Sequence, residues 1–259
     1  MIVAGCDVGS LTSKVVILGD GKILAARIMR AKSRPEDSAR EVMGLALAEA
    51  GIDIDAVEYC VGTGYGRKKI PFVEHVVSEI ECHGKGARWL CPSVMMIIDV
   101  GGQDAKAIKL DTDGNVIRYV YNDKCASGTG RFIEIMADAL EIKLENMGEI
   151  SMSSKNPVKI SNQCVVFAET EVISLVNDGY KISDVVGGLH KAMANRVSSL
   201  ARGIGIEQDV TMSGGVAKNI GMYTALEEAL GVPIKKIEVD PQIVGALGAA
   251  LLAAEALQK

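Results

Sequence analysis

The feature that most constrains the fold is the sequence Asp-Val-Gly-Gly-Gln-Asp at residues 99–104, which lies between two short apolar runs. The run at 93–98 suits a buried strand, and the run at 105–110 suits a second strand that returns beside it. Glycine carries no Cβ, so backbone N–H groups at such a turn can approach an anion closely. The carboxylates beside it can hold a hydrated Mg²⁺ ion, which prefers oxygen ligands. The segment therefore predicts a strand-to-strand corner that binds phosphate and metal.

The same arrangement occurs near the N-terminus. Residues 7–10 read Asp-Val-Gly-Ser and match residues 99–102, and Lys14 matches Lys106 within one residue. A single Asp-x-Gly turn is as consistent with an ordinary hairpin as with a phosphate site. Two copies with matching flanks favour a nucleotide site built from two similar halves.

The composition excludes several classes of protein. A hydrophobic content of 48% with 24% charged residues excludes disorder, and 259 residues suffice for one domain or two small ones. The net charge is −5, the basic residues are scattered and only 4% of residues are aromatic, so we expect neither nucleic acid nor an anionic membrane as a partner. The first residues show no basic signal-peptide region, and no apolar run is long enough to cross a bilayer. We therefore expect a cytoplasmic protein.

Strand-like and helix-like segments alternate along the chain, which predicts the α/β class. Further strands are expected at 23–29, 57–61, 115–121, 209–212 and 234–239. Helices are expected at 39–50, 72–90, 130–140, 167–177, 182–203, 220–230 and 241–257.

Three glycine-rich segments carry further interpretations. Residues 213–215, Ser-Gly-Gly, open a helix and form a third candidate anion or ribose site. Residues 245–250 place small side chains on one helix face, which fits either close crossing at a hinge or a well-packed Ala-rich helix. Residues 62–67, Gly-Thr-Gly-Tyr-Gly-Arg, fit a cleft lining, a docking loop or a plain turn equally well.

The six cysteines do not form a recognisable metal motif by themselves. No two of them have Cys-x-x-Cys spacing, and a reducing compartment disfavours disulfides. Cys6 and Cys60 lie in apolar strands and are interpreted as small core residues. From the residues alone, Cys125 and Cys164 are also best interpreted as buried apolar thiols.

Four segments in this order resemble the nucleotide signature of the acetate kinase, sugar kinase, heat-shock chaperone and actin superfamily. They are Asp-x-Gly-Ser at 7–10, Asp-x-Gly-Gly at 99–102, Ser-Gly-Gly-Val at 213–216 and Gly-Ala-Leu-Gly at 245–248. The resemblance implies two ribonuclease-H-like (actin-like ATPase) lobes, with ATP or ADP and Mg²⁺ in the cleft between them. The lobes would comprise residues 1–92 and 93–259, and the last helix is free to pack back on the first lobe.

A closer resemblance rests on residues 122–132, Asn-Asp-Lys-Cys-Ala-Ser-Gly-Thr-Gly-Arg-Phe, together with residues 99–104 and 164–173. These segments resemble the activator (component A, an ATPase) of 2-hydroxyacyl-CoA dehydratases, and the ATPase subunits of benzoyl-CoA reductase are similar. The resemblance implies a homodimer with one [4Fe-4S] cluster at its interface, held by Cys125 and Cys164 of each chain. It also implies a 2-hydroxyacyl-CoA dehydratase as partner and a ferredoxin or flavodoxin as electron donor. Both thiols are expected at helix N-termini, where the dipole favours thiolate.

The site residues are assigned by position. Asp7 and Asp99 are expected to hold Mg²⁺ through water, and Gln103 or Asp104 to orient the attacking water. The residues expected to contact the phosphates are Ser10, Thr12, Ser13, Lys14, Gly101 and Gly102. The residues expected to face the α-phosphate, base or ribose are Gly214, Gly215, Lys218 and Gln242.

The predicted mechanism couples ATP hydrolysis to lobe closure, which changes the surroundings of the cluster and passes one electron to the dehydratase. The competing interpretation is a small-molecule kinase of the same superfamily, for example an amino-sugar kinase. That activity would need a sugar-binding insert and a catalytic base over the acceptor, and the sequence offers neither. A non-enzymatic scaffold of the actin type is a third interpretation.

Overall fold

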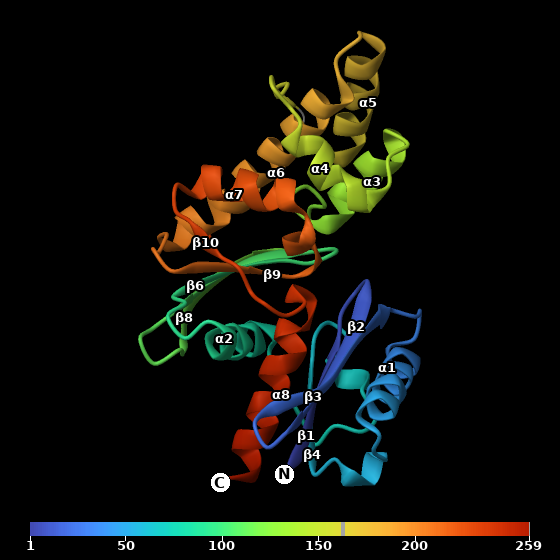
Figure 1. The fold of residues 1–259 in the computed structure, drawn as a ribbon, viewed down its shortest axis with the longest axis vertical. Coiled ribbons are helices and arrows are strands. Elements are labelled where there is room, and N and C mark those ends of the chain that lie inside the picture. Colours follow the sequence, from blue (N-terminus) through green and yellow to red (C-terminus); the bar gives the residue numbers. More distant parts are fainter. Residues whose placement is uncertain (162–163, 259) are drawn as a thin grey trace. The chain divides into compact units, whose positions relative to one another are not determined.

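A computed structural model describes residues 1–161 and 164–258, and the chain divides into two compact units (Figure 1). Unit 1 comprises Met1–Met95, Leu110–Ile117 and Ile237–Lys259, and unit 2 comprises Met96–Lys109 and Arg118–Lys236. The C-terminal helix thus belongs to unit 1 together with the N-terminal segment.

Unit 1 contains a mixed five-stranded sheet with the order β3-β2-β1-β4-β5. Strand β1 runs antiparallel to β2 and parallel to β4, so that Asp7 lies opposite both Lys14 and Thr63. The elements of unit 1 are β1 (Ile2–Val8), β2 (Thr12–Gly19), β3 (Lys22–Arg30), α1 (Pro35–Ala50), η1 (Ile54–Ala56), β4 (Tyr59–Thr63), η2 (Arg67–Lys69), β5 (His75–Val76), α2 (Glu79–Leu90), η5 (Pro241–Ile243) and α8 (Val244–Leu257).

Both faces of this sheet are covered, which explains the nearly continuous apolar character of β1 and β2. One face packs against α1 through a core that includes Cys6, Val15 and Val42. The other face packs against α2 and α8 through a core that includes Val3 and Leu247. Strands buried on both sides are expected to be apolar at every position rather than at alternate ones.

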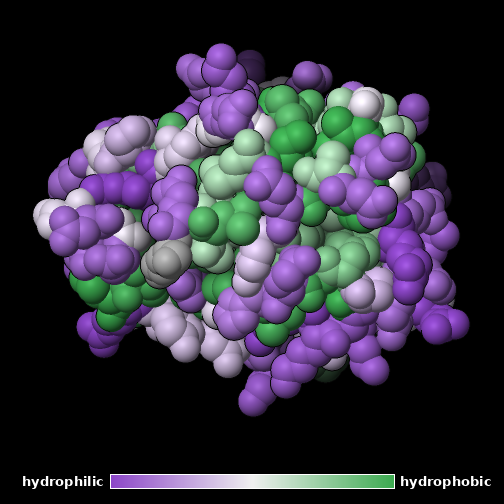
Figure 2. Space-filling view, turned by 90° about the horizontal axis from the view of Figure 1, so that it is seen from below, coloured by the Kyte–Doolittle hydropathy of each residue, from purple (hydrophilic) through white to green (hydrophobic). Residues whose placement is uncertain are grey.

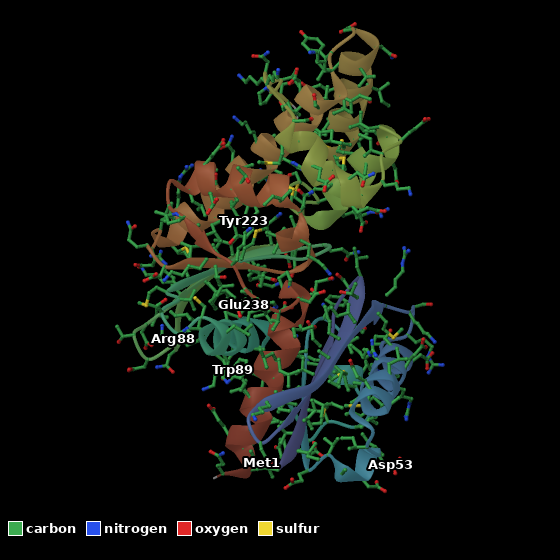
Figure 3. All side chains as sticks on the ribbon, viewed as in Figure 1. Met1, Asp53, Arg88, Trp89, Tyr223 and Glu238 are labelled. Carbon is green, nitrogen blue, oxygen red and sulfur yellow. The ribbon has the colours of Figure 1, made fainter. Side chains whose placement is uncertain are left out.

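The prediction of a helix at 72–90 is wrong for its first part. Residues His75–Val76 form β5, which pairs in parallel with β4, and α2 begins only at Glu79. The Val-rich stretch before α2 favours the extended conformation because its side chains are β-branched. Ser78 caps the helix by accepting a hydrogen bond from the backbone N–H of Ile80 at 3.3 Å. At the other end, Arg88 donates to the carbonyl of Val94 at 2.8 Å and to that of Thr112 (Figure 3).

Unit 2 contains a second mixed sheet, with the order β10-β9-β6-β7-β8. Asp99 lies opposite both Lys106 on antiparallel β7 and Ser213 on parallel β9. The elements that carry unit 2 are β6 (Met96–Val100), β7 (Ala105–Leu110), β8 (Val116–Asn122), α3 (Gly130–Ala139), η3 (Leu144–Asn146), α4 (Met147–Met152), α5 (Val165–Asn177), α6 (Ile182–Ile204), β9 (Val210–Ser213), η4 (Gly215–Lys218), α7 (Ile220–Leu230) and β10 (Ile234–Lys235).

The two sheets share one topology. In each, the first strand of the half lies at the centre, the second and third follow on one side, and the fourth and fifth follow on the other. This arrangement confirms the α/β class and the two similar halves inferred from the repeated turn.

The core of unit 2 lies between its sheet and its helices. Met96, Ile98 and Val100 of β6 pack with residues of α3, α6 and α7, and Tyr223 of α7 donates from its hydroxyl to the carbonyl of Ile234 at 2.7 Å (Figure 3). Helix α5 lies at the end of unit 2 farthest from the sheet (Figure 1).

No helix among the described residues is both long and apolar enough to span a membrane. On the face drawn in Figure 2, hydrophilic residues are interspersed with hydrophobic ones.

Candidate functional site

The turn between β6 and β7 places a buried lysine between two carboxylates. Lys106 Nζ lies 3.1 Å from Asp99 Oδ2 and 2.5 Å from Asp104 Oδ2. Ser213 donates from its hydroxyl to Asp99 Oδ1 at 2.9 Å. Asp99 and Lys106 are each only 3% exposed. Two carboxylates and one ammonium leave one net negative charge, so this corner suits a cation.

The turn between β1 and β2 repeats this geometry with one carboxylate fewer. Lys14 Nζ lies 3.2 Å from Asp7 Oδ2 and 3.4 Å from the carbonyl oxygen of Thr12. Because Thr12 occupies the position that Asp104 has in the other turn, the charges of this corner cancel. A corner without net charge is a better host for phosphate than the Asp99 corner.

The backbones of the two turns correspond residue for residue. Gly9 N–H donates to the carbonyl of Thr12 at 3.1 Å, and Gly101 N–H donates to that of Asp104 at 2.9 Å. Lys14 and Lys106 each follow the first aspartate by seven residues, so the correspondence needs no shift.

A glycine in the left-handed region covers each corner. Gly64 follows β4 with a φ of +87°, and Gly214 follows β9 with a φ of +85°. A Cβ on Gly64 would lie 2.3 Å from Asp7 Oδ1, and one on Gly214 would lie 2.9 Å from Asp99 Oδ1 and 2.3 Å from the carbonyl oxygen of Val100. Loop 62–67, whose role the sequence left open, is therefore part of the Asp7 corner.

Sequence reasoning missed two participants, Lys106 and Gly64. Lys106 was used only to align the repeat, although its spacing from Asp99 already places it opposite that residue across the hairpin. Gly64 follows a strand as Gly214 does, and comparing the two strand ends would have found it.

The remaining expected phosphate and nucleoside contacts have varied surroundings. Ser10 and Gln103 are exposed, whereas Ser13 is fully buried and its hydroxyl has no hydrogen-bond partner among the described residues. The Ser-Gly-Gly segment leads into the four-residue η4 rather than directly into α7, which begins at Ile220. Gln242 lies in unit 1, where its backbone N–H donates to Asp240 Oδ1 at 3.0 Å.

The Asp99 turn is bonded directly to the start of α3. The backbone N–H of Gly130 donates to the carbonyl of Gly101 at 2.8 Å, and that of Arg131 donates to the carbonyl of Gly102 at 2.9 Å. These two bonds satisfy N–H groups that a helix start otherwise leaves unpaired. The turn and the first residues of α3 are therefore directly connected.

That segment carries Cys125. Its Sγ lies 3.0 Å from Ser127 Oγ, and the hydrogen bond from Ser127, aided by the charge of Arg196, lowers the pKa of the Cys125 thiol. Asn122 fixes the loop by donating to the carbonyls of Cys125 at 2.8 Å and Ser127 at 3.3 Å. The prediction that Cys125 lies at a helix N-terminus is wrong, because α3 begins five residues later at Gly130. A hydroxyl and a guanidinium favour its thiolate instead.

Cys164 is the N-cap residue of α5, which confirms its expected place at a helix N-terminus. It is exposed, so its interpretation from the residues alone as a buried apolar thiol is wrong. In contrast, Cys6, Cys60 and Cys82 are buried, and burial raises their pKa values, that of Cys82 to about 12. The interpretation of Cys6 and Cys60 as core residues is confirmed. Unlike these three buried thiols, Cys125 has a lowered pKa.

Over residues 1–161 and 164–258, no group of three or more His, Cys, Asp or Glu side chains could hold a metal ion. Cys125 and Cys164 of one chain therefore supply at most half of the four thiolates that a cubane cluster requires.

The chain matches the profile of the BadF/BadG/BcrA/BcrD ATPase family over residues 4–253. The activator of lactoyl-CoA dehydratase from Anaerotignum propionicum is 44% identical over 260 residues, which cover 100% of each chain. The activator of the 2-hydroxyisocaproyl-CoA dehydratase from Clostridium difficile, solved with bound ADPNP, gives a TM-score of 0.95 at 40% identity and covers 100% of this chain and 96% of that one. The structure of the (R)-2-hydroxyglutaryl-CoA dehydratase component A from Acidaminococcus fermentans gives a TM-score of 0.96 at 41% identity and covers 100% of each chain. These matches confirm the predicted fold class, α/β with two actin-like ATPase lobes.

Proposed function

Because the chain belongs to the BadF/BadG/BcrA/BcrD ATPase family, we propose that it hydrolyses ATP to activate a 2-hydroxyacyl-CoA dehydratase by donating one electron to it. Two relatives named as activators of such dehydratases match this chain over its whole length, which supports the proposal. The observation that carries it is the pair of hydrogen bonds between the Asp99 turn and the start of α3, because they link the Asp99 corner to the segment that carries Cys125.

The two corners divide the charges of Mg²⁺ and ATP between them. Asp99 and Asp104, with one excess negative charge around Lys106, would hold Mg²⁺ through its water ligands. Asp7 is the carboxylate that we propose for Mg²⁺ in unit 1, and Lys14 would contact a phosphate as a point charge. Gln103, exposed on the turn, would orient the attacking water.

The remaining phosphate and nucleoside contacts come from backbone and short side chains. The residues proposed to surround the phosphates are Ser10, Thr12, Ser13, Gly101 and Gly102. The residues proposed to surround the nucleoside end are Gly214, Gly215, Lys218 and Gln242. Glycine N–H groups are suited to this task because no Cβ keeps the anion away.

The thiols fit an iron–sulfur cluster that is shared between two copies of the chain. The lowered pKa of Cys125 favours the thiolate form that binds iron, and Cys164 is exposed at the start of α5, where a metal can reach its sulfur. A [4Fe-4S] cluster held by Cys125 and Cys164 of each of two chains would supply the one-electron carrier. A homodimer with two-fold symmetry is the simplest arrangement that provides four such thiolates.

The chain's own contribution to coupling is mechanical. When the 101–104 turn adjusts to the terminal phosphate, the carbonyls of Gly101 and Gly102 move with it. Because these carbonyls accept from the N–H groups of Gly130 and Arg131, α3 and the Cys125 segment follow. We propose a ferredoxin or flavodoxin as the external electron donor.

The test is to purify the protein without oxygen and to measure iron, sulfide and ATP-dependent electron delivery. We expect about two iron atoms per chain, as one shared four-iron cluster requires. Delivery of reducing equivalents from dithionite to a 2-hydroxyacyl-CoA dehydratase should require ATP and fail with ADP. The variants Cys125→Ala and Cys164→Ala should each abolish iron binding, whereas the buried Cys60→Ala should retain it.

Iron content that is unchanged in the Cys125 and Cys164 variants, or equal electron delivery with and without ATP, would refute the proposal. A colourless, iron-free protein that releases ADP only when an amino sugar is supplied would favour the kinase instead.

A further inference from the structure

Helices α2 and α8 cross so closely in unit 1 that backbone meets backbone. A Cβ on Gly248 would lie 1.7 Å from the carbonyl oxygen of Cys82, and one on Gly86 would lie 2.2 Å from that of Val244. Helix α8 approaches β1 equally closely, since a Cβ on Gly5 would lie 2.0 Å from the carbonyl oxygen of Ala246. These three glycines fix α2, α8 and β1 against one another with no side chain at the contact points.

This packing brings His83 of α2 to the Asp7 corner. His83 is 6% exposed, and its Nε2 atom lies 3.0 Å from the point where a Cβ on Gly245 would sit. Asp7 Oδ2 lies 3.2 Å from the same point. The imidazole and the carboxylate therefore both lie against Gly245, in the first turn of α8, where any larger residue would press on both.

The two corners differ at this position. Asp99 receives a hydrogen bond from the hydroxyl of Ser213, which lies opposite it on the parallel strand. Thr63 has the same register opposite Asp7, but its hydroxyl donates to the carbonyl of Val77 at 3.0 Å. On the side of the helices, the imidazole of His83 and the carboxylate of Asp7 both border Gly245, so His83 is a polar group of α2 that lies beside this corner.

We propose that His83 is a positioning residue for Asp7 and holds its carboxylate in the orientation that receives the water ligands of Mg²⁺. The inference deepens the proposed function and rests on it, because it concerns the Mg²⁺·ATP site. Groups that orient metal-binding carboxylates fix the metal site, and losing one typically costs 10–100-fold in metal affinity or activity.

The experiment measures two quantities for the full-length protein: steady-state ATP hydrolysis as Mg²⁺ is varied at saturating ATP, and, without turnover, the Mg²⁺ concentration needed to raise the thermal midpoint in the presence of ADP, which should shift in the same direction. For His83→Ala, we expect the Mg²⁺ concentration at half-maximal rate to rise about 10–100-fold, with kcat at saturating Mg²⁺ within about threefold of wild type. His83→Gln should restore most of the Mg²⁺ affinity, because its side-chain amide can reach the position of Nε2. A purely structural role would lower the amount of active protein and leave the Mg²⁺ dependence unchanged.

Gly245→Ala provides a second variant that leaves the imidazole in place. Its methyl group would displace Nε2 and Oδ2 by a few tenths of an ångström, so we expect a smaller rise in the required Mg²⁺ concentration. Gly44→Ala is the matched control, since a Cβ on Gly44 in α1 would meet nothing within 4 Å. It should leave the Mg²⁺ dependence at the wild-type value.

An unchanged Mg²⁺ dependence in either His83→Ala or Gly245→Ala, with wild-type protein hydrolysing ATP normally, would overturn the role of His83 and leave the proposed function standing. If His83→Ala does not fold, Gly245→Ala alone decides. Wild-type protein that neither binds nor hydrolyses ATP would instead refute the proposed function.

Discussion

Replacing Lys106 by Met should destabilise the protein and make its stability more dependent on Mg²⁺. The ammonium of Lys106 is 3% exposed and compensates both Asp99, which is nearly as buried, and Asp104, whose side chain is 27% exposed. Removing one partner of a buried ion pair costs about 3–5 kcal/mol, because the remaining charge loses its compensation. Since Asp104 is partly hydrated, we expect about 3 kcal/mol.

The assay is urea unfolding at 25 °C, with and without Mg²⁺. Mg²⁺ should stabilise Lys106→Met more than wild type, because the variant corner holds two carboxylates and no cation. Lys109→Met is the control on the same strand, since Lys109 pairs with Glu207 at a more exposed position and should cost less than about 1 kcal/mol. Equal stability of the two variants, or an equal effect of Mg²⁺ on wild type and Lys106→Met, would refute the reasoning.

Two further predictions concern packing and pH. Gly248→Ala should lower the thermal midpoint strongly, because its Cβ would lie 1.7 Å from a carbonyl oxygen of α2. The control Gly203→Ala should stabilise α6 by up to about 1 kcal/mol, because a Cβ there would meet nothing within 4 Å. Similar thermal midpoints of the two variants in calorimetry would contradict this prediction. Burial lowers the pKa of His190 to about 4, below the value of about 6.5 in an unfolded chain. The unfolded state therefore binds more protons between these values, so the stability present above pH 6.5 is lost as the pH falls toward 4, by on the order of 3 kcal/mol. Urea unfolding at pH 7 and pH 4.5 should show this loss in wild type and less of it in His190→Gln, and an undiminished loss in the variant would exclude His190 as its source.

The alternation of strands and helices and the repeated turn predicted the fold class, and short segments at 99–104, 122–132 and 164–173 supported the family resemblance. Both depend on local chemistry: an aspartate, a glycine and a lysine at fixed spacing on a hairpin need no distant residue to be recognised. Helix α7 was predicted at its observed bounds because Asn219 and Gly231 mark its two ends. The resemblance to ATPase activators of dehydratases is confirmed by the family match and by the relatives that carry those names.

The features that sequence reasoning missed depend on contacts between distant segments. His83 was assigned no role from the sequence, because its proximity to Asp7 requires the crossing of α2 over α8. Strand β5 was interpreted as part of a helix, since only its pairing with β4 makes so short a strand stable. The start of α3 was predicted at its observed position, Gly130, but the loop that separates Cys125 from this start was not taken into account.

The glycine contacts between α2, α8 and β1 have a mechanical consequence. Interfaces filled by side chains adapt when those side chains change rotamer, but a backbone carbonyl packed against a Cα atom has no rotamer to change. A displacement of α2 must therefore move α8 and β1 as well, so that these three elements behave as one rigid body. Any flexibility within unit 1 must therefore come from the segments that connect to α2, α8 and β1.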